Sequence, residues 1–463
     1  MIWPTACLAL LSASLFACSA SSAPGETALN KREHSAESPA HAAASRVERS
    51  GKAAFPGATG YGAQAIGGRG GRIIRVTTLA DREPGSLREC LVAKGPRVCV
   101  FDVAGTVRFV GEPPVVREPF LTIAGETAPG AGITLAHSGG PEARSPLLIK
   151  NTHDVVVRHI RVRNDREGEH REAEDAITIE ASEYVIVDHV SASWARDEIV
   201  NGYADNDWIT ISNSIFAFGL PRHDKCALLA SDPNDAQHMS FVMNICAHSG
   251  DRNPDINFPP GSCVEVTNNV FFNAQSEFAE IWETYGGTPV SLVGNWFIGG
   301  PSTSDAAIGI VRQQLGSRGP AQLYEKDNRF DGAFRERSAG LSQIIVDAPP
   351  CDLVTEPRPA MQAFAAVLAS SGAWPRDAID AQVVAHIREK KGRIVRTPGR
   401  IPDVRHGAAP GPQDSDRDGM PDEWETRHGS DPRAADSWSD SDGDGWANFE
   451  NYLDDRASAR RAG

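Results

Sequence analysis

Short apolar segments in which hydrophobic and polar positions alternate recur through the middle of the chain, from about residue 147. Six of them are rich in β-branched residues: VVVRHIRV, VIVDHVSA, ITISNSIF, SFVMNICA, VEVTNNVF and VSLVGNWF. An alignment on one polar position places consecutive segments 30, 25, 30, 25 and 26 residues apart, at His159, His189, Ser214, Asn244, Asn269 and Asn295. Short strands at this period predict a β-solenoid, in which each coil stacks on the next. The aligned Asn and Ser side chains are expected to point inward and to hydrogen-bond along the coil axis.

Two other architectures fit this pattern less well. A helical repeat would place apolar residues at i, i+3 and i+4, whereas these segments alternate with period two. A β-sandwich is the structural alternative, although it would usually show closer strand spacing and hairpin dipeptides. Residues 361–391 do have a helical pattern, in two pieces broken at 372–375. These helices are expected to pack on the outside or at the end of the solenoid, as a cap that protects a terminal coil from edge pairing.

The first 22 residues form a short apolar run that ends in small residues. The run is too short to span a membrane and is typical of a signal peptide, so a secreted or outer-membrane location is expected. Leu15-Phe16-Ala17-Cys18 resembles a lipobox, with Cys18 as a candidate lipid anchor, and an ordinary cleaved signal is the alternative. Residues 23–52 lack hydrophobic periodicity and predict a disordered linker. The glycine-rich stretch that follows has no phosphate-binding spacing and predicts tight turns before a strand.

Without Cys7 and Cys18, six cysteines are left: Cys90, Cys99, Cys226, Cys246, Cys263 and Cys351. An even number in an exported chain permits disulfides. Cys90 and Cys99 would close a short loop and are the best pair. Cys226 and Cys246 lie about one coil apart and would stack in a solenoid. Buried free thiols are the alternative for this second pair.

The formal net charge is −15, with 61 acidic and 46 basic residues. This balance argues against nucleic acid as the main partner, because phosphate binding requires a basic surface. An anionic polysaccharide is still possible if a metal ion or a local basic cleft offsets the repulsion.

Two acidic loops near the end of the chain, within residues 411–456, have the pattern of calcium-binding EF-hand loops. The first, DSDRDGMPDEWE, has Gly419 at its sharp turn and the complete ligand set Asp414, Asp416, Asp418, Met420 (through its carbonyl), Asp422 and Glu425. The second, DSDGDGWANFEN, supplies Asp440, Asp442, Asp444, Trp446 (through its carbonyl), Asn448 and Asn451. Asn451 cannot chelate with two charged oxygens, although Glu450 precedes it, so weaker binding is expected there. A solvated acidic tail is the alternative for both loops.

Several stretches between about residues 53 and 400 occur in an order that resembles the pectate lyases of polysaccharide lyase family one. They are AFPGATGYGAQAIGGRGG, PGSLRECL, VFDVAGTV, VIVDHVSASWARDE, HDKCALL, HSGDRNP and VLASSGAWPRDAIDAQVV. The resemblance implies an all-β, right-handed parallel β-helix that acts as a monomer. It also implies calcium-dependent β-elimination of polygalacturonate or pectin. Tandem calcium loops also occur on relatives of this kind.

The resemblance assigns calcium ligands residue by residue. Asp175, in EDAITI, matches the first calcium-binding aspartate of the family, and Asp197, in ARDEIVN, matches the second. Asn201 stands where the family usually has a further aspartate, so one negative charge is lost. Glu198 is a candidate to compensate for that charge.

The resemblance also assigns a base and a set of substrate contacts. Arg252, in GDRNPDIN, matches the family's proposed base, although a guanidinium with a pKa above about 12 should stay protonated. Either its surroundings lower that pKa, or Arg252 steadies the carbanion while hydroxide takes the proton. Lys225 matches the substrate-binding lysine, with Arg222 and His223 as further donors, and Asn257 replaces a second arginine.

The dipeptide Asp188-His189 is a signature of the family, and we interpret it as a buried hydrogen-bonded pair that orders its coil and supports the calcium site. A polygalacturonase-type glycoside hydrolase is the first alternative function, since Asp175, Asp197 and Asp188 would then be its catalytic carboxylates. A non-catalytic β-helix that binds wall polysaccharide is the second.

Overall fold

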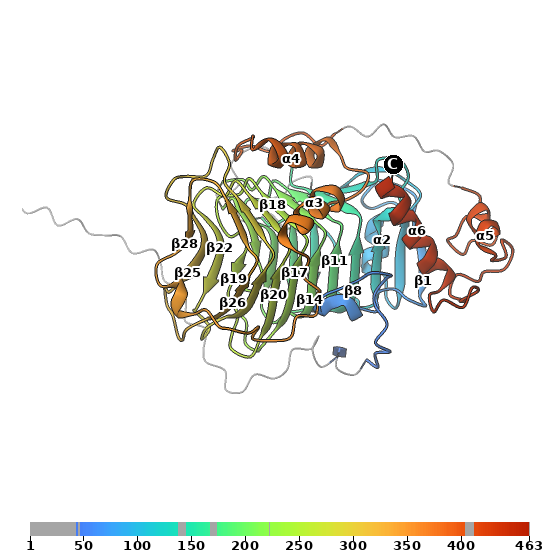
Figure 1. Cartoon of the computed structure of the whole chain (residues 1–463). Coiled ribbons are helices and arrows are strands. Elements are labelled where there is room, and N and C mark those ends of the chain that lie inside the picture. The colour runs from blue at the N-terminus through green and yellow to red at the C-terminus, as the bar shows by residue number, and fades with distance from the viewer. Residues whose placement is uncertain are drawn as a thin grey trace, which may run out of the picture. The chain divides into compact units, whose positions relative to one another are not determined.

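Three parallel β-sheets form the walls of a right-handed parallel β-solenoid of about nine turns (Figure 1). The computed structural model describes residues 43–44, 47–137, 145–166, 174–221, 223–402 and 412–462. Every pairing between neighbouring strands of the three sheets is parallel. The expected parallel β-helix is therefore confirmed.

The sheets contain ten, nine and nine strands, and along the chain one coil after another contributes to each. Sheet A consists of β1 (Arg72–Val76), β2 (Arg97–Phe101), β5 (Leu121–Ala124), β8 (His153–Arg158), β11 (Glu183–Asp188), β14 (Asp207–Ser212), β17 (His238–Val242), β20 (Cys263–Thr267), β23 (Pro289–Val293) and β26 (Gln322–Lys326). Sheet B consists of β3 (Gly105–Phe109), β6 (Ile133–His137), β9 (Ile160–Arg163), β12 (Ser191–Ser193), β15 (Ile215–Ala217), β18 (Ile245–Ala247), β21 (Val270–Phe272), β24 (Trp296–Ile298) and β27 (Arg329–Asp331). Sheet C consists of β4 (Val115–Val116), β7 (Leu147–Lys150), β10 (Ile177–Glu180), β13 (Glu198–Tyr203), β16 (Lys225–Leu228), β19 (Asp255–Ile256), β22 (Glu277–Trp282), β25 (Ile308–Gln313) and β28 (Arg335–Arg337).

Columns of aliphatic side chains run through the interior because the strands pair in register. Val155, Val185 and Ile209 are consecutive partners in sheet A, and all three are fully buried in the main core. In a strand, every second side chain points to the same face, so period-two sequences place one aliphatic residue per coil above the next. This is the physical origin of the repeat seen in the sequence.

Buried asparagines form a ladder of hydrogen bonds along the inside of the solenoid, as expected. Asn244 Oδ1 accepts a bond from the backbone N–H of Ser214 at 2.9 Å, and Asn269 Oδ1 accepts one from the N–H of Asn244 at 2.8 Å. Asn295 Oδ1 continues the series by accepting from the N–H of Asn269 at 2.9 Å. These bonds satisfy backbone donors at corners where no strand partner is available.

The expected alignment is wrong by one residue at the start of this ladder. The N–H of Val190 donates to Ser214 Oγ at 3.0 Å, so Val190, and not His189, lies level with Ser214. His159 and His189 instead stack on each other, 4.8 Å apart, at a corner where both have positive φ. The corner position and the ladder position are adjacent in sequence, and alignment on polarity alone cannot separate them.

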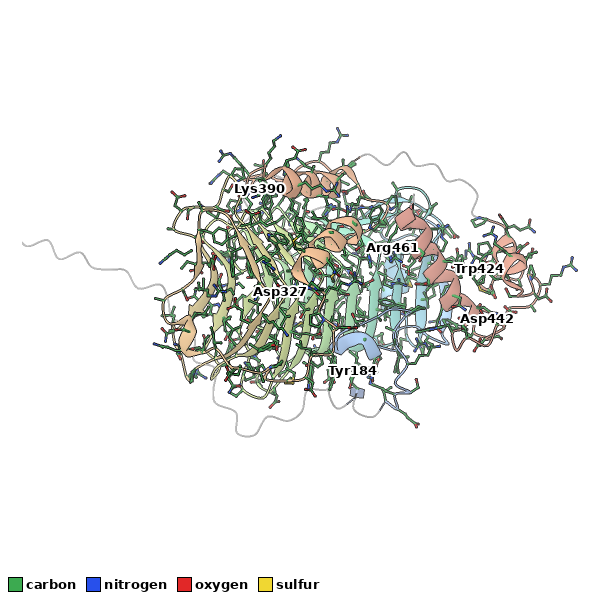
Figure 2. All side chains as sticks on the ribbon, in the orientation of Figure 1. Tyr184, Asp327, Lys390, Trp424, Asp442 and Arg461 are labelled. Atoms are coloured by element: carbon green, nitrogen blue, oxygen red, sulfur yellow. A yellow bond between two sulfur atoms is a disulfide. The ribbon has the colours of Figure 1, made fainter. Side chains whose placement is uncertain are left out.

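Helices α3 (Ala360–Ser370) and α4 (Ala378–Glu389) pack against the outer face of sheet B. The buried side chains between these helices and the sheet include Val367, Leu368, Val383, Val384, Ile215, Ile245 and Phe272. Lys390, which Figure 2 labels next to α4, donates from Nζ to Asp331 Oδ1 in β27 at 2.6 Å. The helices therefore lie on the outside of the solenoid, which was one of the two expected positions. The expectation that they cap its end is wrong. No helix in the described part of the chain combines the length and apolarity that crossing a bilayer requires.

The N-terminal end of the solenoid is closed by α2 (Leu87–Val92), which the sequence pattern did not reveal. Leu87 and Leu91 are fully buried in the main core. Buried Arg97 donates from Nε to the carbonyl of Cys90 at 2.9 Å and from Nη2 to that of Leu91 at 2.8 Å. These bonds satisfy carbonyls that a helix end leaves without an internal partner.

Three disulfides join Cys90 to Cys99, Cys226 to Cys246 and Cys263 to Cys351. The first two pairs were expected from the sequence and are confirmed. The first disulfide joins helix α2 to β2, and the second joins β16 of sheet C to β18 of sheet B. The third pair depends on a long connection that spacing alone does not predict.

The glycine-rich segment before β1 runs across the outer face of sheet A. A Cβ atom on Gly62 would lie 2.5 Å from the carbonyl oxygen of Val185, so only glycine fits there. Its N–H donates to Thr210 Oγ1 at 2.8 Å. The fold also includes the last residues of the predicted linker, since Arg49 Nη1 lies 2.6 Å from Asp154 Oδ1. The predicted signal peptide and most of the linker lie outside the described residues.

Candidate functional site

Ionisable side chains from consecutive coils lie level with one another across sheet C. Glu198 and Lys225 are direct partners in the pairing of β13 with β16. One coil earlier, Ile177 pairs with Val200. Asp175 precedes Ile177 by two residues and Glu198 precedes Val200 by two, so this register places Asp175 beside Glu198.

The row continues to Arg252 on the next coil. Leu228 pairs with Asp255, and these residues follow Lys225 and Arg252 by the same three positions. The carbonyl of Arg252 also accepts a bond from the N–H of Ala227 at 2.9 Å. Strands in a sheet lie about 4.8 Å apart, so the row from the first coil to the fourth spans about 14 Å. The chain thus brings Asp175, Glu198, Lys225 and Arg252 together in space.

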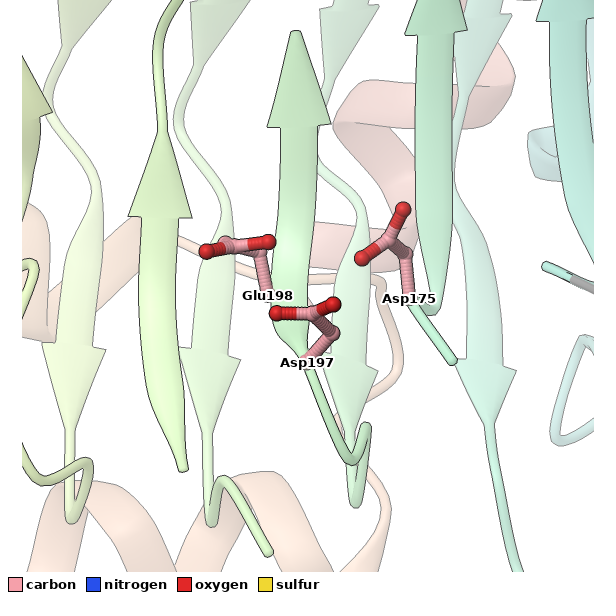
Figure 3. A group of neighbouring side chains, drawn as sticks. All are labelled: Asp175, Asp197 and Glu198. Atoms are coloured by element: carbon pink, nitrogen blue, oxygen red, sulfur yellow. The ribbon is translucent and has the colours of Figure 1, made fainter. Parts of the chain in front are cut away.

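At one end of this row, three carboxylates form the sheet C acidic cluster: Asp175, Asp197 and Glu198 (Figure 3). Each offers an oxygen within 4.8 Å of the others. Asn201 Nδ2 donates to Asp175 Oδ2 at 3.0 Å, while its Oδ1 is buried without a hydrogen-bond partner among the described residues. His223 Nδ1 lies 3.1 Å from Asp197 Oδ1. Glu198, which the sequence offered only as a possible substitute ligand, is therefore a full member of the cluster.

The cluster binds protons more tightly than ordinary carboxylates do. Burial, together with the negative charge of Asp197, raises the pKa of Asp175 to about 7. Burial, followed by the charges of Asp175 and Asp197, raises the pKa of Glu198 to about 9, and nearby Arg252 only partly opposes this. A divalent cation would replace the bound proton and relieve the same repulsion.

The donor set fits calcium. The three members of the cluster offer carboxylate oxygens, and Asn201 adds an amide oxygen; hard cations such as calcium prefer oxygen ligands of both kinds. The Oδ1 of Asn201 is one further unsatisfied oxygen, on a side chain whose amide group contacts the cluster. Asp197 is 21% exposed, so an ion held there would be reachable by a ligand from outside.

Arg252 is held as a cation by acidic neighbours. Its Nη1 makes a short contact with Glu198 Oε1, and its Nε lies 3.5 Å from Asp255 Oδ2. Its backbone N–H donates to Glu280 Oε1 at 2.8 Å, which fixes the start of the side chain. Burial alone would lower the pKa of Arg252, but the carboxylates of Glu198 and Asp255 outweigh it and raise the pKa above the usual value.

A second set of acids beyond Arg252 was not anticipated from the sequence. Lys225 Nζ makes a short contact with Asp251 Oδ1. Burial raises the pKa of Asp255 to about 7 and, together with the charge of Asp255, that of Glu280 to about 8. Asp251 and Asp255 were a usable signal in the sequence, because HSGDRNPDIN runs into β19 of sheet C as ARDEIVN runs into β13 of the same sheet.

Asp188 and His189 lie elsewhere, at the end of β11 in sheet A. His189 Nδ1 is 2.6 Å from Asp188 Oδ2, and Ser212 Oγ donates to Asp188 Oδ1 at 2.8 Å. Burial would raise the pKa of Asp188, but the neighbouring His189 and Arg158 hold it well below its ordinary value. The pair orders its own coil, and its partners among the described residues all lie in or beside sheet A. It makes no hydrogen bond or ion pair with the sheet C acidic cluster among the described residues, and the carboxylate trio of the hydrolase alternative does not come together, because Asp188 lies on sheet A.

Asn257 and Arg222 are the remaining substrate contacts predicted from the sequence. Asn257 follows β19 and is half-buried, and its Oδ1 is itself buried without a hydrogen-bond partner within the described part of the chain. Arg222 lies outside the described residues, between Pro221 and His223.

The first tail loop folds as a turn in which carboxylates accept backbone N–H groups. Asp414 accepts from Gly419 at 3.1 Å, and Asp418 accepts from Met420 at 3.0 Å. The oxygens of Asp414, Asp416 and Asp418 lie within 4.8 Å of one another. The predicted ligand Asp422 is used differently, since both its oxygens accept bonds from Ser415 at 2.7 Å.

The second loop repeats this arrangement. Three exposed carboxylates come within 4.8 Å of one another, those of Asp440, Asp442 and Asp444, and the N–H of Trp446 donates to Asp444 Oδ1 at 2.7 Å. Asn448 Oδ1 accepts the N–H of Ser441 at 3.1 Å, just as Asp422 closes the first loop.

The two residues at the end of the second loop have separate roles. Asn451 donates from Nδ2 to Asp444 Oδ2 at 3.2 Å. Glu450 forms ion pairs with Lys52 and Arg69, and its Oε2 also accepts the N–H of Ala447 in the loop at 3.0 Å.

Comparison with known proteins identifies the family. No protein-family model matches the chain. It is 34% identical over 390 residues to a probable pectate lyase C of Aspergillus terreus, in an alignment that covers 81% of this chain and 87% of that protein. A probable pectate lyase C of Neosartorya fischeri is 34% identical over 393 residues, covering 80% and 86%. The crystal structure of jun a 1, the major allergen from cedar pollen, has the same fold, with a TM-score of 0.53 at 18% identity over 68% of this chain and 92% of that one. The chain belongs to the pectate lyase family of polysaccharide lyases.

Proposed function

We propose that this lyase cleaves de-esterified polygalacturonate by calcium-dependent β-elimination and leaves a 4,5-unsaturated sugar at the new end. The single observation that carries the proposal is the row on sheet C, in which an acidic cluster adjoins Lys225 and Arg252. An anionic polymer needs both features, since a chain with net charge −15 would otherwise repel it.

Asp175, Asp197, Glu198 and the Oδ1 of Asn201 would hold the calcium ion. When bound beside a uronate, calcium would stabilise the negative charge that develops on the carboxylate as the C5 proton leaves. Glu198 would then share its negative charge between the ion and Arg252, which it contacts in the structure.

Arg252 and Lys225 would act on the substrate itself. Lys225 can exchange its contact with Asp251 for a uronate carboxylate. The raised pKa of Arg252 favours a protonated guanidinium, which donates to the developing oxyanion while a hydroxide from solvent removes the C5 proton. The electron pair left on C5 then forms the C4=C5 double bond while the C4–O4 bond breaks, and the O4 oxygen leaves with the pair of that bond and gains a proton from water.

The test is an ultraviolet assay on polygalacturonate and on methylated pectin, with calcium and with chelator. An elimination creates a conjugated product that absorbs, whereas a hydrolase creates only new reducing ends. New reducing ends without absorbance would refute elimination. Undiminished turnover in chelator would refute the calcium requirement.

Calcium binding by the two tail loops is also part of the proposal. Both loops gather three aspartate oxygens around one point, in a turn closed by their own backbone N–H groups. Isothermal titration of the full chain should therefore detect calcium beyond the single site of sheet C. A stoichiometry of one would contradict this part.

Export of the protein to the cell surface or the medium is the remaining part of the proposal. Three disulfides are typical of an oxidising compartment, and the N-terminal apolar run is typical of an export signal. If Cys18 carries a lipid, a Cys18→Ala variant should move from the membrane fraction to the medium. An unchanged distribution would favour an ordinary cleaved signal.

A further inference from the structure

The acidic tail lies directly on the first coils of the solenoid. Its helices α5 (Asp422–His428) and α6 (Asn448–Ala462) bring apolar side chains onto the outer face of sheet A. The shared buried cluster contains Met420, Trp424, Phe449, Tyr452 and Leu453 from the tail and Val98, Val100 and Ala124 from the solenoid. Met420 and Phe449 are both fully buried. The tail is therefore part of the folded unit in this structure, although its composition resembles that of a solvated segment.

The first calcium loop itself touches the solenoid. Gly419 has φ of 97°, and a Cβ there would lie 2.8 Å from Ile73 Cγ2 in β1. Asp414 Oδ2 accepts a bond from Arg75 Nη1 at 2.5 Å. Trp438, between the two loops, donates from Nε1 to the carbonyl of Gly71 at 2.9 Å. The shape of the loop and the docking of the tail therefore depend on each other.

A second group of carboxylates lies behind this loop, and we name it the clasp cluster: Asp418, Glu425 and Asp436. Their oxygens approach within 4.8 Å of one another. Glu425 is fully buried, and neither of its carboxylate oxygens has a hydrogen-bond partner in the described part of the chain. A buried carboxylate without donors, next to two more carboxylates, is strongly unfavourable unless a cation is present.

Asp436 belongs to neither twelve-residue loop, and it connects the two halves of the tail. Its N–H donates to Asp418 Oδ2 at 3.1 Å. On its other side, Asn448 at the start of α6 donates from Nδ2 to Asp436 Oδ1 at 3.1 Å. An ion held by the clasp cluster would therefore join the first loop to the helix that lies on the solenoid.

We propose that a divalent cation of the calcium class binds between Asp418, Glu425 and Asp436 and locks the tail onto the first coils of the β-helix as a clasp. Asp436 replaces the sequence-predicted ligand Asp422, whose oxygens already close the loop on Ser415. The inference rests on the calcium binding proposed for the tail, but it is independent of the reaction on sheet C. Its consequence is that calcium stabilises the N-terminal end of the solenoid as well as the active site.

Hydrogen exchange of the full-length protein, followed by mass spectrometry in calcium and in chelator, tests the clasp. At a calcium concentration about one hundred times the dissociation constant, mass action reduces opening of the tail about one-hundredfold. Amides of residues 448–462 and of β1 should gain protection by about that factor. Equal protection of these peptides in calcium and chelator would overturn the clasp, even if titration showed that the loops bind calcium.

Two variants locate the effect. Glu425→Gln should remove the calcium-dependent gain in protection of α6, and Asp436→Asn should do the same if the first variant folds poorly. Glu423→Gln is the matched control on the same helix, since the Glu423 side chain is 86% exposed and pairs only with nearby Arg427 among the described residues. A full calcium-dependent gain in both Glu425→Gln and Asp436→Asn would refute the site.

A third variant separates the clasp from catalysis. Asp197→Asn should impair calcium-dependent elimination and leave the calcium response of α6 intact. Loss of both responses in Asp197→Asn would show that the two sites are one system and would overturn an independent clasp.

Discussion

Replacement of Asn201 by Asp tests the calcium site in both its ion-free and its ion-bound states. In the structure, Asn201 Nδ2 donates to Asp175 Oδ2 at 3.0 Å and stabilises that carboxylate without calcium. An aspartate cannot donate in this way, but it adds the negative charge that the family usually has at this position. The substitution should therefore destabilise the ion-free protein and strengthen calcium binding.

The size of each effect follows from the contacts. Loss of a hydrogen bond to a charged group costs about 1.5–3 kcal/mol. The new repulsion adds little, since Asp175 with a pKa of about 7 takes up a proton at pH 7 for about 0.4 kcal/mol. With an unfolding entropy of about 2.1 cal/mol/K per residue over about 400 residues, a loss of about 2 kcal/mol lowers the Tm by about 2–3 °C. In calcium, one extra charge should raise affinity by about tenfold or more, which corresponds to about 1.4 kcal/mol.

The assay combines thermal unfolding in chelator with the calcium dependence of elimination. Asn151→Asp is a suitable control, because it adds the same charge at an exposed position at the end of β7. The expected signature of Asn201→Asp is a lower Tm in chelator together with a lower calcium requirement. A raised or unchanged calcium requirement would show that Asn201 is not a ligand.

Four further predictions concern the reaction, the pH dependence of calcium binding, the pH dependence of stability, and the fold. Arg252→Ala should reduce the elimination rate by at least about one-thousandfold without lowering the Tm by more than a few degrees, because it removes the cation that faces the developing charge; a rate within tenfold of wild type, measured by ultraviolet absorbance, would remove Arg252 from the mechanism. Calcium binding at sheet C needs an ionised Glu198, whose pKa is raised to about 9, and an ionised Asp175, whose pKa is raised to about 7, so the calcium concentration for half-maximal activity should fall about tenfold per pH unit from 7 to 9 and more steeply below 7; a flat profile from pH 5 to 8 would contradict this. The raised pKa of Asp175 makes the ion-free protein lose stability as pH rises from about 4 to about 7, which chemical unfolding in chelator can measure. Gly62→Ala should cost about 1–3 kcal/mol in the same unfolding assay, since its Cβ would meet the carbonyl oxygen of Val185, and wild-type stability would show that the segment does not lie on sheet A.

The repeat on sheet A shows how far local patterns reach. Alternating valines and isoleucines identified the strands, because each coil buries its alternate side chains in the same way. The alignment at His189 was wrong by one residue, because the polar corner residue, which has positive φ, directly precedes the residue whose position belongs to the inward hydrogen-bond ladder. Helix α2 was also missed, because a six-residue helix has too short a pattern to stand out.

The acidic sites show a similar division. The motifs indicated Asp175 and Asp197, but Glu198 became a full cluster member only when the register placed it beside Asp175. Likewise the loop pattern named Asp422, whereas in the folded tail the carboxylate that lies beside Asp418 and Glu425 is that of Asp436, from outside the loop. The sequence alone does not reveal the place of Glu198 or of Asp436, because each depends on which side chain faces a neighbour that is distant in sequence.

The sequence by itself determined that this chain coils into stacked β-strands, because burial of every second side chain imposes a period that can be read directly. It also determined the oxygen-rich loops of the tail, since their turn geometry is local. Only the tertiary structure decided which acids lie together in one cluster, that acidic neighbours raise the pKa of Arg252, and that the tail lies on the solenoid. These properties depend on distances between coils and on burial, and both arise only when the strands pair in one register.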